Sequence, residues 1–583
     1  MNISRHLCCS LTVLGCLIFV HSGELLLRVP TAQGAAPKPA WAKQGMVVSA
    51  HPLASQIGLD ILKAGGNAVD AAVATAFALG VTEGYSSGIG GGSFTLLHLA
   101  NRWETVAVDG REEAPAAANR NMYVDKASGQ VIPELSTTGV LAAAVPGHVA
   151  ALCLLLDRYG SMSLGQVLEP SIALADSGFE LSQTYVRVLE NQKDRLKRFS
   201  SSFEIFFHPD STVLGLGERL VQHDLAQTYR LLAEEGDDAF YKGEIAQLIA
   251  AAMLPDSGLI TVEDLASYRA KIRRPVLGSY RGFTVYSMPP PSSGGVHLIQ
   301  MLNVLERYDL HYLGHNSSET IHLMAEAMKR AFADRAVYMG DPGFASIPVA
   351  GLISKAYADS LARTISRFHA SKVSGPGNPT PYLPPADMSK GQHTTHLSVI
   401  DRWGNMVAMT ATINTGFGSG FVVPGTGVLL NNEMDDFSAA PGVENFFGLV
   451  GDEANSIAPH KRPLSSMTPT FVFYQGRPFM ILGSPGGPRI ITTVLQVILN
   501  VIDHNMDIQA AVDAPRIHHQ WKPDKLYLED GIPADVIQNL VIKGYEAVPG
   551  GNWGAAEAIL IDLETGIIYG GSDSRIEGAA KGY

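Results

Sequence analysis

The 583-residue sequence predicts an α+β fold, because helical and strand-like patterns both recur along it and no linker-like break divides its second half. Apolar residues follow helical spacing over 53–63, 68–79 and 321–333. Strand-like patterns cover 395–400 and 406–413, and a short polar turn between them predicts a β-hairpin. A hydrophobic content of 46% is ample for a large core.

Shorter signals place the other elements of the first hundred residues. A strand is expected over 46–50, before the two helices. Residues 64–67 separate these helices, and their Gly and Asn suit a helix C-cap followed by a new N-cap. A glycine-rich run over 84–93 then leads into an expected strand over 94–99.

The middle of the chain is predicted to be mostly helical, from about residue 147 to residue 338. A strand at 283–286 and a Pro/Ser/Gly turn at 289–295 interrupt it. Residues 370–392 are rich in Pro, Gly, Ser and Lys, which predicts an exposed and flexible segment.

Charge and cysteine content exclude several classes of protein. The formal net charge is −13 and there is no long Lys/Arg run, which argues against nucleic-acid binding. Three of the four cysteines lie within the first twenty residues. The fourth, Cys153, stands in an apolar run, so we expect a buried thiol with no internal disulfide and no cysteine metal cluster.

The N-terminus is typical of a secretory signal. Arg5 and His6 precede the apolar run Leu7–Val20, which is short for a membrane span. Small residues before Ala35 suit cleavage, so we assign 1–34 to a signal peptide and expect a periplasmic or extracellular protein. A signal retained as an anchor, or a lipid on Cys16, stays open as an alternative.

The most informative stretch is His393-Thr394-Thr395-His396, followed at eighteen and twenty residues by Thr412 and Asn414. A threonine hydroxyl is a weak nucleophile unless a base assists it, and an N-terminal threonine has such a base in its own α-amino group. An α-amino group ordinarily has a pKa of about 7.7–8.0, which suits proton transfer near neutral pH. Thr394 in this role requires the chain to cleave itself after His393.

Five further segments accompany this stretch in a fixed order. They are Asp109-Gly110-Arg111-Glu112-Glu113-Ala114-Pro115, Asn431-Asn432-Glu433-Met434-Asp435-Asp436-Phe437, Arg462-Pro463-Leu464-Ser465-Ser466-Met467, Gly483-Ser484-Pro485-Gly486-Gly487 and Ala514-Pro515-Arg516-Ile517-His518-His519-Gln520-Trp521, with Thr394-Thr395-His396 between the first two. With these segments the chain resembles the γ-glutamyltranspeptidases, which are N-terminal-nucleophile hydrolases. The resemblance extends over nearly the whole chain after the signal.

The resemblance implies a four-layer αββα sandwich built jointly by two fragments of one precursor. It implies a large subunit over 35–393 and a small subunit over 394–583, which stay together as a heterodimer after cleavage between His393 and Thr394. Thr394 would first attack the His393 carbonyl and afterwards the substrate. Thr412 would hydrogen-bond the nucleophile, and Gly486 and Gly487 would stabilise the oxyanion, since glycine lets backbone N–H groups approach closely.

A γ-glutamyl group carries an α-carboxylate and an α-ammonium, so its pocket needs a cation and anions together. By resemblance, Arg111 binds the carboxylate as a planar fork, with added hydrogen bonds from Ser465 and Ser466. The ammonium-binding positions implied by the resemblance are Asn414, Glu433 and Asp436. Some relatives have Gln where this chain has Glu433, which adds a charge.

A connection over 437–451 resembles the lid loop of bacterial relatives. A tyrosine common in that lid corresponds here to Phe447, which lacks the hydroxyl. The side chain at that position therefore cannot form the hydrogen bond to the catalytic region that a tyrosine hydroxyl could form.

The expected activity is γ-glutamyl transfer and hydrolysis without a metal or organic cofactor. The expected partners are glutathione or other γ-glutamyl compounds as donors, and water, amino acids or peptides as acceptors. An acylase of the same superfamily acting on glutaryl groups is one alternative, although such groups lack the ammonium that Glu433 and Asp436 would bind. An exported binding protein without chemistry, which would stay uncut, is another.

Three weaker motifs are not assigned chemistry. Gly84-Tyr85-Ser86-Ser87-Gly88 matches a serine-hydrolase pattern, but that motif follows a strand and opens a helix, and here the expected order is reversed. Residues 89–93 lack the Lys-Ser/Thr ending of a phosphate loop. His518 and His519 are adjacent and would point to opposite faces of a strand, so no metal site is expected there.

Overall fold

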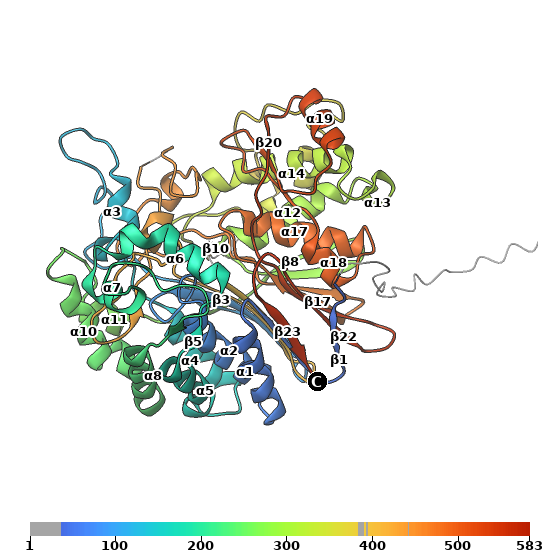
Figure 1. The fold of residues 1–583 in the computed structure, drawn as a ribbon. Helices are drawn as coiled ribbons and strands as arrows, with labels where there is room; N and C mark the ends of the chain where they lie inside the picture. Colours follow the sequence, from blue (N-terminus) through green and yellow to red (C-terminus); the bar gives the residue numbers. More distant parts are fainter. Residues whose placement is uncertain (1–36, 383–389, 392–394, 441) are drawn as a thin grey trace, which may run out of the picture.

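The computed structural model describes residues 37–382, 390–391, 395–440 and 442–583. The signal peptide expected over 1–34 and the expected cleavage residues His393 and Thr394 lie outside the described residues. Figure 1 shows two stacked β-sheets between two layers of helices. This is the αββα arrangement expected from the resemblance.

The first sheet has seven antiparallel strands, and strands from both sides of residue 394 alternate within it. In spatial order they are β23 (Ala579–Gly582), β2 (Met46–Ser49), β12 (Thr395–Ile400), β13 (Met406–Thr412), β3 (Gly92–Leu99), β4 (Glu104–Gly110) and β7 (Lys271–Arg273). The predicted hairpin is confirmed as β12 and β13, in the middle of this sheet.

The second sheet also has seven antiparallel strands. In order they are β1 (Ala40–Ala42), β22 (Ile568–Ser572), β21 (Glu557–Ile561), β17 (Arg477–Gly483), β16 (Thr470–Tyr474), β9 (Phe283–Ser287) and β8 (Val276–Tyr280). Its four central strands come after residue 394 and its edges come before it. Because the two parts share both sheets, neither could leave without breaking strand pairs.

The two sheets meet through an apolar core that includes Met46, Phe94, Met406, Phe471 and Ile559. Each sheet's other face is covered by helices, as Figure 1 shows. On the first sheet these include α1 (Pro52–Lys63), α2 (Ala68–Thr82), α4 (His148–Tyr159), α5 (Leu164–Ser177) and α8 (His223–Glu235). On the second they include α12 (Ser293–Leu305), α14 (Ser318–Tyr338), α17 (Arg489–Ile502) and α18 (Ile508–Asp513).

Local sequence signals account for several boundaries. The side chain of Asn67 accepts hydrogen bonds from the backbone N–H groups of Val69 and Asp70, and Asp70 accepts one from Asn67 N, so the predicted N-cap is a capping box. The expected turn at 289–295 is partly wrong, because Ser293 already begins α12. There Ser292 is the N-cap, and its Oγ accepts from Gly294 N at 2.9 Å.

The structure also tests the predictions for the region 147–338 and for Cys153. The mostly helical region between 147 and 338 also holds β7 and β8, which the sequence pattern did not reveal. Cys153 is buried and unpaired, as predicted, and burial raises the pKa of its thiol. Within the described ranges, no helix is long and apolar enough to cross a membrane.

Candidate active site

The end of the β12–β13 hairpin positions two of the predicted site residues, Thr412 and Asn414. Thr412 ends β13 and lies opposite Gly92 of β3. Its Oγ1 accepts a hydrogen bond from Asn414 N at 2.7 Å, and Asn414 adopts a positive φ of 76°. The amide Nδ2 of Asn414 donates to Asn432 O at 2.9 Å, whereas its buried Oδ1 has no hydrogen-bond partner in the described part of the chain.

The glycine-rich run before β3 supports this hairpin. A Cβ on Gly91 would lie 1.7 Å from the carbonyl oxygen of Thr412, and one on Gly90 would lie 2.1 Å from that of Leu429. Only glycine permits such close backbone packing. Because α2 precedes the run and β3 follows it, the reversed order that argued against a serine nucleophile at Ser86 is confirmed.

At the predicted site, one arginine lies among three carboxyl groups. Arg111 is fully buried, and its Nη2 donates to Asp436 Oδ2 at 2.8 Å. Its Nη1 pairs with Glu433 and, at 3.2 Å, with Glu112. Its Nε donates to Pro463 O at 3.2 Å. The structure thus joins three predicted site residues directly and adds Glu112, to which sequence reasoning gave no role.

Acidic groups outnumber the guanidinium in this cluster, and their pKa values reflect it. Burial raises the pKa of Glu112 to about 7, although Arg111 opposes the shift. The pKa of Glu433 is raised well above its usual value, by burial and by the nearby Glu112 and Asp436 carboxyls. Among the described residues, three carboxyl groups therefore contact the single guanidinium group of Arg111.

A second buried cation lies beside the serine segment. Arg335 of α14 is 4% exposed and donates through Nε to Ser293 Oγ at 3.0 Å, and it forms no ion pair with any described residue. Ser293 N donates in turn to Ser465 O at 3.0 Å. Burial lowers the pKa of Arg335 to about 10, opposed by the Asp436 charge. The sequence offered no motif for this residue.

Both serines of the predicted pair are buried, and Ser465 makes local contacts. Its Oγ accepts from Met467 N at 3.1 Å, and its backbone N–H donates to Pro291 O at 3.2 Å. Ser466 accepts at its carbonyl from Thr468 Oγ1 at 2.7 Å. The segment that carries both serines also supplies the Pro463 carbonyl that contacts Arg111, so the serines belong to the same neighbourhood.

The predicted oxyanion glycines form a turn between β17 and α17. Gly486 and Gly487 have φ values of 131° and 60°, which side-chain-bearing residues rarely adopt. The turn is held at Ser484, whose Oγ accepts from Ala555 N at 3.1 Å. A Cβ on Gly486 would meet the backbone of Gly554 at 3.3 Å, so segment 553–556 lies directly against the turn.

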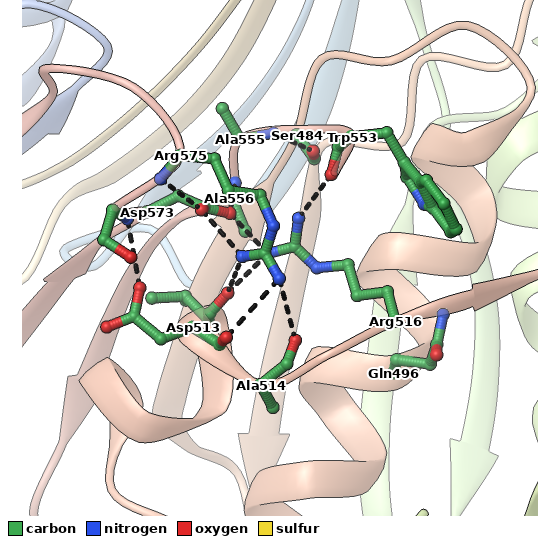
Figure 2. Close-up of polar contacts among 12 residues, drawn as sticks. Ser484, Gln496, Asp513, Ala514, Arg516, Trp553, Ala555, Ala556, Asp573 and Arg575 are labelled. Carbon is green, nitrogen blue, oxygen red and sulfur yellow. Dashed lines mark hydrogen bonds and ion pairs between the residues drawn. The ribbon is translucent and has the colours of Figure 1, made fainter. Parts of the chain in front are cut away.

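Segment 553–556 is fixed in turn by buried ion pairs. Figure 2 shows Arg516 and Arg575 converging on Asp573, next to Trp553 and Ser484. Arg516 Nη1 donates to Trp553 O at 2.8 Å, and Asp573 Oδ2 accepts from Ala556 N at 2.9 Å. The motif around Arg516 therefore supports the glycine turn indirectly, through segment 553–556.

The predicted lid folds over the acidic residues. Asn445 Nδ2 donates to Asp436 Oδ1 at 3.4 Å, and Phe446 N donates to Asp435 Oδ2 at 3.1 Å. The backbone carbonyl of Phe447 accepts from Gln520 Nε2 at 3.1 Å. Backbone and amide groups therefore attach this loop without a tyrosine hydroxyl.

The adjacent histidines take separate protein partners. His518 contacts Thr492 Oγ1 at 2.9 Å and Gln520 Oε1 at 3.0 Å. His519 Nδ1 accepts from Trp521 N at 3.1 Å. Among the described residues no three His, Cys, Asp or Glu side chains are placed to hold a metal ion.

Comparison with known proteins places this site in a family. The family model described as gamma-glutamyltranspeptidase matches residues 54–583. The chain belongs to the γ-glutamyltranspeptidase family. The glutathione hydrolase proenzyme of Escherichia coli K12 is 45% identical over 548 residues, covering 94% of this chain and 93% of that protein.

Two members with acylase names are also similar. The acylase ACY 1 proenzyme of Pseudomonas sp. SE83 is 42% identical over 520 residues, which is 88% of either chain. The crystal structure of a cephalosporin acylase from Bacillus halodurans superposes with a TM-score of 0.84 at 32% identity, covering 95% of this chain and 98% of that one. The fold is therefore shared by proteins named for different acyl donors.

Proposed function

We propose that this protein is a γ-glutamyltransferase and glutathione hydrolase that matures by cleavage between His393 and Thr394. The family match over 54–583 and the relatives named glutathione hydrolase proenzyme support the activity and the precursor. Thr394 is the nucleophile, and its α-amino group accepts the hydroxyl proton. Its Oγ attacks the γ-glutamyl carbonyl, the amine leaves, and the ester on Thr394 passes to water, an amino acid or a peptide.

The observation that carries the choice of donor is the excess of carboxyl groups around Arg111. An incoming γ-glutamyl group brings one carboxylate and one ammonium. We assign the carboxylate to Arg111, with Ser465 and Ser466, and the ammonium to Glu433 and Asp436, so the ligand exchanges partners within the existing ion pairs. The ammonium gives these carboxyl groups a cationic partner, whereas a glutaryl group has no ammonium to supply.

Asn414, Thr412 and the glycine turn are assigned roles from where they lie in the structure. Asn414 presents a buried, unpartnered Oδ1 beside Thr412 and is assigned to the ammonium. Thr412 is assigned to the nucleophile as its hydrogen-bond partner. The turn at Gly486 and Gly487 is assigned to the oxyanion, because contacts with segment 553–556 hold its backbone in place before any ligand arrives.

Export and the division into two subunits complete the proposal. We infer that residues 1–34 direct export and that 35–393 and 394–583 form a heterodimer. Both parts contribute strands to both sheets, which favours a complex that survives cleavage.

The decisive experiment is intact mass measurement with N-terminal sequencing of the wild type and Thr394→Ala. We expect two wild-type fragments, one beginning at Thr394 and the other near Ala35, and a single mutant chain. A wild type that stays whole and inactive would instead support a binding protein without chemistry.

An acylase is the second candidate, because the Pseudomonas sp. and Bacillus halodurans proteins carry that name. The two activities are separated by comparing γ-glutamyl and glutaryl derivatives of the same amine. Faster turnover of the glutaryl compound would overturn the proposed donor while leaving the nucleophile intact.

A further inference from the structure

Glu83 is a buried carboxyl group next to the first strand after the proposed cleavage site. It follows α2 directly and is 5% exposed. Its Oε1 accepts from the Tyr85 hydroxyl at 2.6 Å, and its Oε2 accepts from Ser86 Oγ at 3.3 Å and Thr395 Oγ1 at 3.4 Å. No described Lys, Arg or His forms an ion pair with it.

Such a group is unfavourable for stability unless its surroundings compensate. Removing a carboxylate from water without a cation costs several kcal/mol, and hydroxyl donors offset only part of this. Buried titratable groups with shifted pKa values cluster at functional sites. The position of Glu83 therefore calls for a role beyond packing.

The turn that carries Glu83 connects two parts of the site. Thr395 is the first residue of β12 and immediately follows Thr394 in sequence. Tyr85 O accepts from Phe417 N at 2.7 Å, in the turn that follows Asn414. The rings of Tyr85 and Phe417 also lie 6.2 Å apart. Glu83 thus sits where the beginning of β12 meets the Asn414 turn.

We propose that Glu83 is a positioning residue that orients the first residue of β12 by accepting the Thr395 hydroxyl. It acts through Thr395 and does not touch the substrate. Held by Tyr85 and Ser86, its carboxylate fixes the strand end to which Thr394 is joined. This inference rests on the proposed function, because it assigns Glu83 to the maturation and turnover that Thr394 performs.

The groups that act on Glu83 are few. Burial raises its pKa to about 7, hydrogen bonds from Tyr85, Ser86 and Thr395 oppose the shift, and the Glu577 carboxyl adds to it. From other elements, Tyr185 of α6 (Gln183–Leu196) and Glu557 of β21 have pKa values that the Glu83 charge raises. These neighbours are all acidic or hydroxyl groups, which agrees with the absence of an ion pair to any described cation.

A double-mutant cycle tests the coupling of Glu83 and Thr395. The variants are Glu83→Gln, Thr395→Val and their combination, assayed for self-cleavage rate and for kcat and KM with L-γ-glutamyl-p-nitroanilide. We expect each single change to lower kcat by about tenfold, with KM within about twofold, and the double variant to be no slower than the slower single. Independent losses that multiply to about a hundredfold, or no loss at all, would overturn the proposal.

Two matched variants separate positioning from general damage. Thr395→Ser keeps the hydroxyl and should restore kcat. Asp334→Asn alters another buried carboxyl, whose pKa is raised to about 6 and which accepts from Tyr357 and Gln300 at 2.8 Å and 2.6 Å. Asp334→Asn should leave kcat unchanged. A loss of kcat in Asp334→Asn as large as that in Glu83→Gln would overturn the proposal.

The remaining outcomes are also decisive. If Glu83→Gln does not fold, the comparison of Thr395→Val with Thr395→Ser decides alone, and equal kcat values would contradict the role. A wild type that neither cleaves nor turns over the anilide would refute the proposed function, and this inference with it. If the wild type is active and the losses from Glu83→Gln and Thr395→Val multiply in the double variant, only the proposed role of Glu83 is refuted.

Discussion

Nη2 of Arg111 donates to Oδ2 of Asp436 at 2.8 Å, although 325 residues separate the two along the chain. The proposed cleavage site lies between them in sequence. The contact is therefore one of the bonds that would hold the two fragments together after cleavage. It also means that residues of both proposed fragments line the proposed substrate pocket.

Asp436→Asn should remove most γ-glutamyl turnover. Breaking a buried, hydrogen-bonded charge pair costs about 3–5 kcal/mol, which corresponds to a loss of about 10²–10⁴-fold in kcat/KM if the ammonium loses the same partner. The measurement is kcat/KM with L-γ-glutamyl-p-nitroanilide.

Asp435→Asn is the matched control. Asp435 contacts Ser136 and Phe446 rather than Arg111, so this substitution should lower kcat/KM far less than Asp436→Asn does.

Binding of glutamate should release protons near neutral pH. An arriving ammonium favours ionised Glu112 and Glu433, so the raised pKa values of these carboxyls fall on binding. The affinity for glutamate should therefore increase as pH rises through about 7, which is the pKa of Glu112 in the ligand-free protein. Calorimetry in buffers of different ionisation enthalpy measures the released protons.

Glutarate is the matched ligand for that measurement, because it lacks the ammonium. Its affinity should decrease with rising pH, since it adds negative charge to the cluster. Identical pH dependence for the two ligands would argue against an ammonium site at Glu433 and Asp436.

Gly486→Ala should impair catalysis more than folding. Alanine at a φ of 131° costs about 1–3 kcal/mol and shifts the turn, which would move the proposed oxyanion donors. Losing one such donor costs about 10²–10³-fold in kcat. Gly566→Ala, in an open turn with a φ of 73°, should show backbone strain without a fall in kcat. Equal kcat values in both variants would contradict the assignment.

Asp573→Asn should lower both stability and kcat. The change leaves Arg516 buried without its charge partner and weakens the support of segment 553–556, at a cost of about 3–5 kcal/mol in the free energy of unfolding. Thermal unfolding and kcat provide the measurements. Asp513→Asn removes a nearby carboxylate that accepts from Ser574 N and Gln509 Nε2, and it should change kcat little.

The sequence predicted the elements near the nucleophile well, because their signals are local. Alternating residues and an intervening turn located the hairpin of β12 and β13, and Asn67 marked the start of α2. The expected turn at 289–295 failed, because Ser292 serves as an N-cap and the small residues that follow it form the first turn of a helix. Composition alone cannot separate those two uses of serine and glycine.

The spacing of motifs located the candidate site but not its connections. Arg111, Glu433 and Asp436 were singled out, yet only the structure shows that they contact one another and that Glu112 joins them. Arg335 and Glu83 had no motif at all. Each is notable only because burial removes it from water, and burial depends on contacts between distant parts of the chain.

The sequence by itself determined the proposed nucleophile, the family and the local helices and strands, since these depend on residues close together along the chain. The tertiary structure decided which charges meet, which of them stay unpaired among the described residues and which segment supports the glycine turn at Gly486. The physical reason is that ion pairing and desolvation act through space. Residues as far apart as Arg111 and Asp436 interact only after the two sheets have brought them together.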